Sequence, residues 1–133
     1  MTVPDAPTAL IIDDSPELRA VMTAFLTHLG LRVLAARDGE TGFALAQEHR
    51  PDLVCLDLML PTVSGLEVCE RLKRSPRTSD VPVLMVSART FPQDRAEARR
   101  AGADAYLTKP LNRQAFSGHV RTLVWQRRLA VGA

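Results

Sequence analysis

Hydrophobic residues along the chain form short, mostly apolar runs separated by longer amphipathic stretches. The runs are 9–12, 31–36, 53–57, 83–87 and 105–108. Strands that are apolar on both faces are typical of a parallel sheet covered by helices on both sides. We therefore expect five parallel strands at these positions.

The first amphipathic stretch predicts a helix that begins at Pro16 and ends at Gly30. Its large apolar residues recur at i, i+3, i+4, i+7, i+8 and i+11, which is the period of a helix with one buried face. They are Leu18, Val21, Met22, Phe25, Leu26 and Leu29. Ser15 precedes Pro16 and is suited to cap this helix.

Four more helices are expected: 39–47, a third that begins at Ser64-Gly65, 92–101, and one that follows Asn112. The third is expected to bury Leu66, Cys69 and Leu72, and the last Phe116, Val120, Leu123 and Val124. The helix 92–101 has only alanines as apolar residues, so it should be weakly anchored. Trp125 lies off the stripe of the last helix and should be exposed.

Strand and helix alternate five times, which is typical of an α/β fold. The pattern predicts a doubly wound, five-stranded parallel sheet flanked by five helices. We expect a single domain over residues 1–133, with a core of about 7–125 and a C-terminal tail 126–133.

Composition limits the kind of protein. A chain of 133 residues that is 46% hydrophobic fits one soluble globular domain. No apolar run reaches transmembrane length and no signal peptide precedes Ala9, so we expect a cytoplasmic protein. Cys55 and Cys69 lie in apolar contexts and should be buried, reduced thiols. A net charge of +2 gives no general attraction to nucleic acid or membranes.

Four of the five expected strands end in polar side chains. These are Asp13-Asp14, Asp57, Ser87 and Lys109. A parallel sheet brings these ends to one edge, where open α/β sheets bind ligands. Each residue alone can be explained as a helix cap or turn residue, and for Asp57 alone that is the better explanation, but the four together indicate a site.

Three carboxylates at one edge repel each other. Two unit charges about 4 Å apart interact by about 4 kcal/mol at an effective dielectric constant of about 20. A hard divalent cation such as Mg²⁺ would offset this repulsion. With such a metal, a carboxylate can attack a phosphoryl group to form an acyl phosphate, whose oxygens Ser87 and Lys109 would stabilise.

The chain resembles the receiver domain of bacterial two-component response regulators. The matching segments cover nearly the whole chain in the right order: Ile11 to Ser15, Leu56 to Pro61 with Ser64-Gly65, Val86 to Ala88, and Ala101 to Pro110. The resemblance implies the flavodoxin-like strand order 2-1-3-4-5. It also implies a cis peptide bond between Lys109 and Pro110.

The same resemblance implies a phosphorylation site with a metal. Asp57 corresponds to the phosphoacceptor. Asp14, Asp57 and the backbone carbonyl of Met59 correspond to direct ligands of Mg²⁺ or Mn²⁺, and Asp13 acts mostly through water.

Other roles follow from the same comparison. Lys109 corresponds to the lysine that pairs with the phosphoryl group or the phosphoacceptor, and Ser87 to the hydroxyl that binds a phosphoryl oxygen. Tyr106 corresponds to the switch aromatic. Met59 and Arg89 flank the path of attacking water, and both are long, so we expect slow loss of the phosphoryl group.

A receiver of this kind is a signalling domain, not a dedicated enzyme, although it assists its own phosphorylation and dephosphorylation. It implies a sensor histidine kinase or a histidine phosphotransfer protein as donor. Phosphorylation would switch the face formed by the fourth helix, fifth strand and fifth helix. The expected target is a downstream protein or an output domain absent from this chain. We expect a monomer or a weak phosphorylation-dependent dimer, with no direct binding of nucleic acid or membrane.

Other functions fit the same residues less well. A nucleotide-binding domain lacks its G-x-G-x-x-G or G-x-x-x-x-G-K motif here. An aspartate-nucleophile phosphatase usually has a second aspartate where this chain has Met59. A phosphorylation-independent pseudo-receiver that only binds proteins is the remaining alternative. Such proteins usually lose an acidic residue or the lysine, and this chain keeps both. Asp104-Ala105 replaces a more common acidic pair, which weakens the prediction of a dimer.

Overall fold

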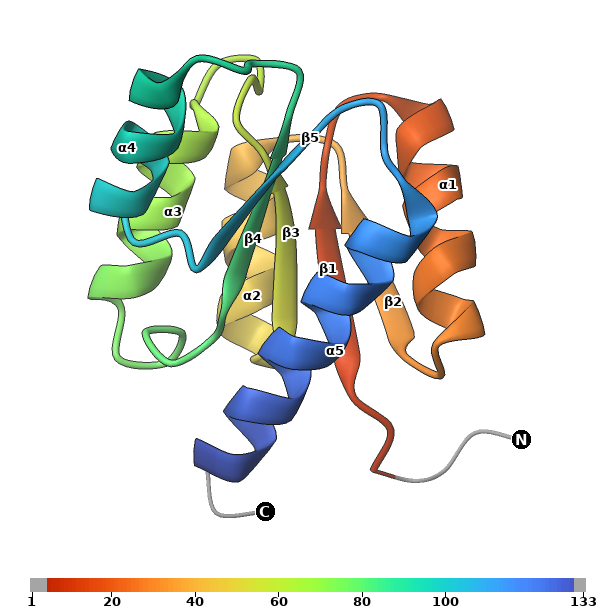
Figure 1. Ribbon diagram of the computed structural model, residues 1–133. Coiled ribbons are helices and arrows are strands. Elements are labelled where there is room, and N and C mark those ends of the chain that lie inside the picture. The colour runs from red at the N-terminus through yellow and green to blue at the C-terminus, as the bar shows by residue number, and fades with distance from the viewer. Residues whose placement is uncertain (1–4, 131–133) are drawn as a thin grey trace.

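The computed structural model describes residues 5–130 as a five-stranded parallel sheet with helices on both faces (Figure 1). The strands are β1 (Thr8–Ile12), β2 (Arg32–Ala36), β3 (Leu53–Asp57), β4 (Val83–Ser87) and β5 (Ala105–Thr108). The helices are α1 (Pro16–His28), α2 (Gly39–His49), α3 (Gly65–Arg74), α4 (Pro92–Arg100) and α5 (Arg113–Ala130). The strand order β2-β1-β3-β4-β5 confirms the predicted doubly wound fold.

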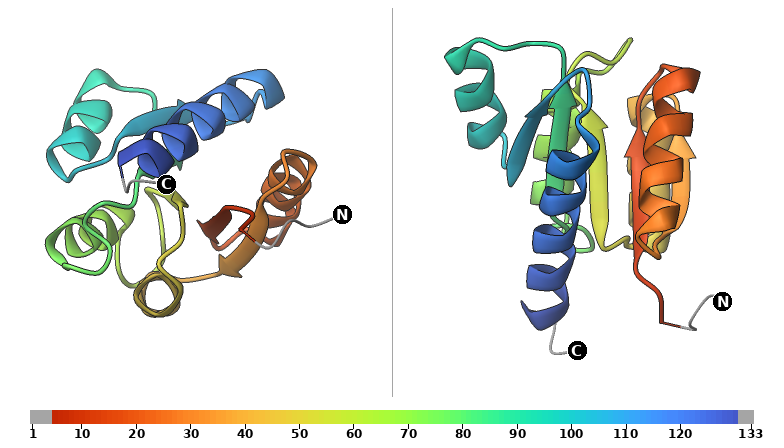
Figure 2. Two further views of the ribbon diagram at one scale, coloured as in Figure 1. Left: turned by 90° about the horizontal axis from the view of Figure 1, so that it is seen from below. Right: turned by 45° about the vertical axis from the view of Figure 1, so that its right-hand side comes forward.

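Two hydrophobic clusters fill the spaces on either side of the sheet. α1 and α5 cover one face, and α2, α3 and α4 cover the other (Figure 2). In β1, Leu10 and Ile12 belong to the cluster under α2 and α3, while Ala9 and Ile11 belong to the cluster under α1 and α5. This two-sided burial explains why the strands are apolar at successive positions.

Helix α1 begins as the sequence predicts, because the Ser15 side chain accepts a hydrogen bond from the Leu18 N–H at 3.2 Å. One member of its expected stripe is placed differently: Val21 is 41% exposed. At 100° per residue, Val21 lies about 140° around the helix from the fully buried Leu26, so it falls at the solvent edge of the stripe.

Helix α2 packs closely on the sheet because its inner face is small. Gly39, Gly42 and Ala46 are its buried residues, and a Cβ on Gly42 would lie 2.5 Å from a side-chain carbon of Ile12. The helix continues to His49, slightly past the predicted end.

Helix α3 buries Cys69 and Leu72 as predicted, together with Val68, which we did not predict; Leu66 is half-buried. Helix α4 buries only Ala98 and Asp94 within its bounds, and Ala96 is exposed. The absence of large apolar side chains in α4 therefore leaves little apolar area against the sheet, and weak anchoring stays a prediction.

Helix α5 buries its predicted stripe of Phe116, Val120, Leu123 and Val124. Trp125 is 66% exposed, which confirms that it lies off the stripe. The helix runs to Ala130, into the stretch expected to be a tail. Its end is tied down by Arg127, a side chain only 9% exposed, which pairs with Asp52 at 3.0 Å and Asp80 at 3.5 Å. No helix within residues 5–130 is long and apolar enough to cross a membrane.

Two glycines give opposite predictions for stability. A Cβ on Gly65 would overlap the carbonyl of Asp57 and lie 2.7 Å from the Cα of Leu58, so backbone atoms would have to move. We expect Gly65→Ala to lower the free energy of unfolding by about 1–3 kcal/mol. Gly118, in α5, has nothing within 4 Å of its Cβ position. Gly118→Ala should therefore raise the free energy of unfolding by up to about 1 kcal/mol. Urea denaturation of both variants measures the two effects, and equal changes would contradict the assignment.

Candidate functional site

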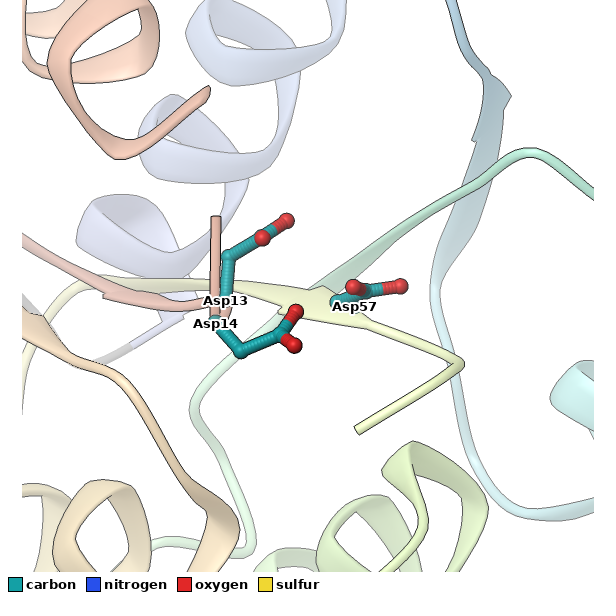
Figure 3. Close-up of side chains that lie close together, drawn as sticks. All are labelled: Asp13, Asp14 and Asp57. Carbon is teal, nitrogen blue, oxygen red and sulfur yellow. The ribbon is translucent and has the colours of Figure 1, made fainter. Parts of the chain in front are cut away.

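The predicted polar residues meet at the carboxyl edge of the sheet. β1 and β3 are neighbours with Ile12 level with Leu56, so Asp13-Asp14 and Asp57 leave the sheet together. Carboxylate oxygens of the three aspartates lie within 4.8 Å of one another. Figure 3 shows the three side chains reaching into the same space from the ends of β1 and β3.

The three carboxylates differ in exposure and in the contacts that hold them. Asp13 is fully buried, Asp57 is 4% exposed and Asp14 is exposed. One oxygen of Asp13 accepts the Ser15 N–H at 2.9 Å. One oxygen of Asp57 accepts the Met59 N–H at 3.0 Å. The start of α1 and the loop after β3 therefore fix the two buried carboxylates, and Asp14 faces the opening.

Lys109 is the cation of the site. Its Nζ lies 3.3 Å from Asp13 Oδ2 and 3.4 Å from Asp57 Oδ2. The lysine is carried to this point by β5, whose Thr108 lies level with Ser87, and by a hydrogen bond from the Lys109 N–H to the Ser87 carbonyl at 2.8 Å. The Lys109–Pro110 peptide bond is cis, as the resemblance implies.

The surroundings of Asp57 alter the pKa of its carboxyl group. Burial raises the pKa of its carboxyl group above the usual range, and the charge of Asp13 acts in the same direction. The Met59 N–H and Lys109 oppose this rise by stabilising the anion, but they do not cancel it.

The donor set fits a hard divalent cation. Three carboxylates and one ammonium leave two formal negative charges in a small space. Oxygen ligands from Asp13, Asp14 and Asp57 suit Mg²⁺, which also retains water ligands. Asp14, as the exposed member of the cluster, leaves one side of it open to solvent.

Ser87 is fully buried at the end of β4. Its hydroxyl oxygen accepts the Arg89 N–H at 3.1 Å, a contact that uses the acceptor side of the hydroxyl group. The loop after β4 then places the Arg89 side chain beside Met59. Arg89 Nε donates to Met59 Sδ at 3.0 Å, so the two long side chains expected beside the path of water are in contact.

A set of contacts that the sequence did not predict surrounds Tyr106. The Tyr106 hydroxyl donates to the Arg89 carbonyl at 2.9 Å. The Arg95 guanidinium lies 4.9 Å from the centre of the Tyr106 ring and donates to Thr108 Oγ1 at 2.9 Å. Arg95 therefore joins α4 to β5 through Tyr106. Nothing in the sequence pattern singles out this arginine among its neighbours.

Asp94 is a second residue that sequence reasoning missed. It is buried, accepts the Phe91 N–H at 3.3 Å and lies 3.7 Å from Arg89 Nη1. An acidic residue at the third position of a helix often accepts a hydrogen bond from the backbone of the residue before the helix. This signal could have identified Asp94, the third residue of α4. The contact with Arg89 links the start of α4 to the loop that follows Ser87.

Comparison with known proteins identifies a consistent set of relatives. The family described as the response regulator receiver domain matches residues 9–121. The DNA-binding dual master transcriptional regulator RpaA of Synechocystis sp. is 46% identical over 118 residues, covering 89% of this chain and 49% of that protein. The chain spans about half the length of the curated relatives first matched.

Solved structures agree with this result. The chemotaxis protein CheY4 of Vibrio cholerae superposes with a TM-score of 0.84 at 27% identity, over 89% of this chain and 98% of that one. The receiver domain of a sensor histidine kinase from Pseudomonas aeruginosa superposes with a TM-score of 0.83 at 26% identity, over 90% and 98% of the two chains. That structure has a magnesium ion coordinated in its active site cleft.

The raised pKa of Asp57 predicts how stability depends on pH without metal. The pKa of Asp57 is higher in the folded protein than in the unfolded chain, so the folded protein binds this proton more tightly. The free energy of unfolding that this proton contributes is lost as the pH rises through the folded-state pKa of Asp57. Asp57→Asn cannot ionise. In a chelating buffer we therefore expect it to be more stable than the wild type at neutral pH, with a difference that disappears in acid.

Asp38→Asn is the matched control, measured by thermal melts at the same pH values. The Thr41 N–H lowers the pKa of the half-buried Asp38, so its ionised form favours folding. The Asn variant should be slightly less stable at neutral pH and equal in acid. The same sign of change in both variants would contradict the burial of Asp57 as the cause.

Proposed function

The chain belongs to the response regulator receiver domain family, and from this we propose that it is a phosphorylation switch with Asp57 as its phosphoacceptor. The donor would be a phosphohistidine of a sensor histidine kinase or a histidine phosphotransfer protein. The observation that carries the proposal is the position of Lys109 Nζ, within 3.4 Å of both buried carboxylates, Asp13 and Asp57.

The reaction proposed is a phosphoryl transfer between two side chains. An Asp57 carboxylate oxygen attacks the phosphorus, the phosphorus–nitrogen bond to the histidine breaks, and the imidazole takes up a proton as it leaves. The product is an acyl phosphate on Asp57. Lys109 and the Ser87 hydroxyl are the protein groups placed to neutralise and bind the phosphoryl oxygens.

We propose that Asp13, Asp14, Asp57 and the Met59 carbonyl hold Mg²⁺ or Mn²⁺, with Asp13 acting mostly through water. When bound, the metal supplies the positive charge that lets an anionic phosphoryl group approach three carboxylates. The exposed position of Asp14 and the buried positions of Asp13 and Asp57 support this arrangement, because they leave one side of the cluster accessible.

The proposed readout is a change of the face formed by α4, β5 and α5. The Arg89 carbonyl accepts from Tyr106, and the Arg89 N–H donates to Ser87, so one residue joins the phosphoryl-binding hydroxyl to the switch aromatic. Arg95 extends the connection to α4. A helix held mainly through Ala98 and Ala101 has little apolar area to resist a shift.

The signal would then act on a downstream protein or on an output domain outside these 133 residues. The relative RpaA is named as a DNA-binding transcriptional regulator, and this chain matches about half of it. A pseudo-receiver that works without phosphorylation is less well supported, because the acidic cluster and Lys109 are all present and in contact range.

Phosphorylation is tested by intact-mass spectrometry. Incubation with acetyl phosphate and Mg²⁺ should add one phosphoryl group to the wild type and none to Asp57→Asn. Asp52→Asn is the control, since Asp52 lies at the opposite end of β3 and is tied to Arg127. Equal labelling of wild type and Asp57→Asn would refute Asp57 as the acceptor, and no labelling of any protein would favour the pseudo-receiver.

Metal binding is tested by thermal melts with and without Mg²⁺. A ligand at 100 times its dissociation constant stabilises the folded state by about 2.7 kcal/mol, so Mg²⁺ should raise the melting temperature. Asp14→Ala should lose this rise and, without Mg²⁺, should be at least as stable as the wild type because repulsion is removed. Glu70→Ala, an exposed charge on α3, should keep the full rise. An unchanged rise in Asp14→Ala would exclude Asp14 as a ligand.

A further inference from the structure

A groove between α1 and α5 is not explained by phosphorylation. Its apolar part is a cavity of about 630 Å³, lined mainly by Pro7, Leu29, Leu31, Val120, Val124 and Trp125. Pro7 precedes β1 and Leu31 precedes β2, so the groove opens at the amino-terminal edge of the sheet, opposite to the edge with Asp57. The two helices lie on the same face of the sheet (Figure 2).

The groove continues along α5 into a more polar part. Two smaller cavities there are lined by His28 from α1 and by Arg113 and Ser117 from α5. Leu29 and Arg121 line both the apolar cavity and the adjoining polar one. The whole groove thus follows α5 from Arg113 to Trp125, which at 1.5 Å per residue is about 18 Å, or three to four helical turns.

The charged side chains that line the groove are all basic. Helix α5 has no acidic residue between Arg113 and Ala130, and the chain from residue 18 to residue 37, which includes most of α1, has none either. Arg113 and Arg121 line the groove, and no acidic residue lines any of its three cavities. A groove with an apolar floor and a cationic side along α5 complements an apolar face that carries carboxylates along one edge.

The wall of the groove that α5 forms is held in place by an ion pair. Trp125 and Arg127 lie about 160° apart around α5, so the ion pair of Arg127 with Asp52 fixes the helix while the indole stays on the outer face. Leu129 is also exposed and lies about 40° from Trp125, which extends the apolar surface by one turn. A wall that is ordered before binding costs less entropy when a partner binds.

We propose that this groove binds an acidic amphipathic helix of a partner protein. The helix lies along α5, its apolar residues contact the Trp125 wall and the floor beside Leu29 and Val124, and its carboxylates face Arg113 and Arg121. This is the helix-in-groove mode of recognition. The site is separate from Asp57, and it does not depend on the proposed phosphorylation.

A second copy of this chain is a poorer occupant. Two copies that met through this face would bring together two α5 helices whose only charged residues are arginines, and like charges placed together oppose association. An acidic helix meets no such repulsion.

The test uses a synthetic 14-residue helical peptide with leucines on one face and glutamates on the other. Because Trp125 is the only tryptophan, peptide binding should shift the emission of the wild-type protein. In fluorescence anisotropy with labelled peptide, Trp125→Ala should weaken binding by about tenfold or more. Arg121→Glu should weaken it to a similar degree and Arg121→Lys should not. Asp57→Asn should bind like the wild type.

The controls separate this site from others. Arg99→Glu reverses an exposed charge on α4 and should leave affinity unchanged. A peptide with lysines in place of glutamates should not bind. The proposal is overturned if the glutamate peptide does not bind, if the lysine peptide binds equally, or if Trp125→Ala and Arg121→Glu bind like the wild type. It is also overturned if sedimentation shows a wild-type dimer that Trp125→Ala abolishes, since the groove would then hold a second copy.

Discussion

The repulsion between two buried carboxylates, Asp13 and Asp57, is the constraint on which the arrangement of the carboxyl edge depends. A single ammonium group, that of Lys109, lies within 3.4 Å of both. That position requires β5 to lie beside β4, with Thr108 level with Ser87. The topology of the last third of the chain is therefore tied to charge balance at the ends of the first and third strands. The negative charge that Lys109 leaves unbalanced is what a cation would neutralise.

Helix α4 buries smaller apolar side chains than the helices on the opposite face of the sheet. α1 and α5 bury large side chains such as Leu26 and Phe116, whereas α4 contributes Ala98 and Ala101. Polar contacts take the place of apolar area in α4, because Arg95 contacts Tyr106 and Asp94 contacts Arg89. Polar contacts of this kind are directional and can be exchanged for others, so α4 is suited to rearrangement, whereas its neighbour α3 buries Val68, Cys69 and Leu72.

The fold could be predicted from the sequence because two signals agree at nearly every element. These are the spacing of the apolar residues and the positions of the capping, glycine and proline residues that end each element. The site was predictable for a similar reason: a parallel sheet brings Asp13, Asp57 and Lys109 to one edge whatever the details of packing. What could not be predicted depends on rotation and distance between elements far apart in the chain. Val21 fits a helical stripe but lies at its edge, and Arg127 looks like part of a charged tail until Asp52 and Asp80 are placed beside it.

The buried ion pair of Arg127 also changes how α5 behaves as a mechanical element. The helix follows directly after the segment that holds Lys109 at one edge of the sheet and is fastened to Asp52 at the other. A helix is stiff along its axis, so α5 acts as a strut about 27 Å long that is fixed at both ends. A displacement at Lys109 would therefore load the Arg127–Asp52 contact at the far end, and bending within the helix would contribute little.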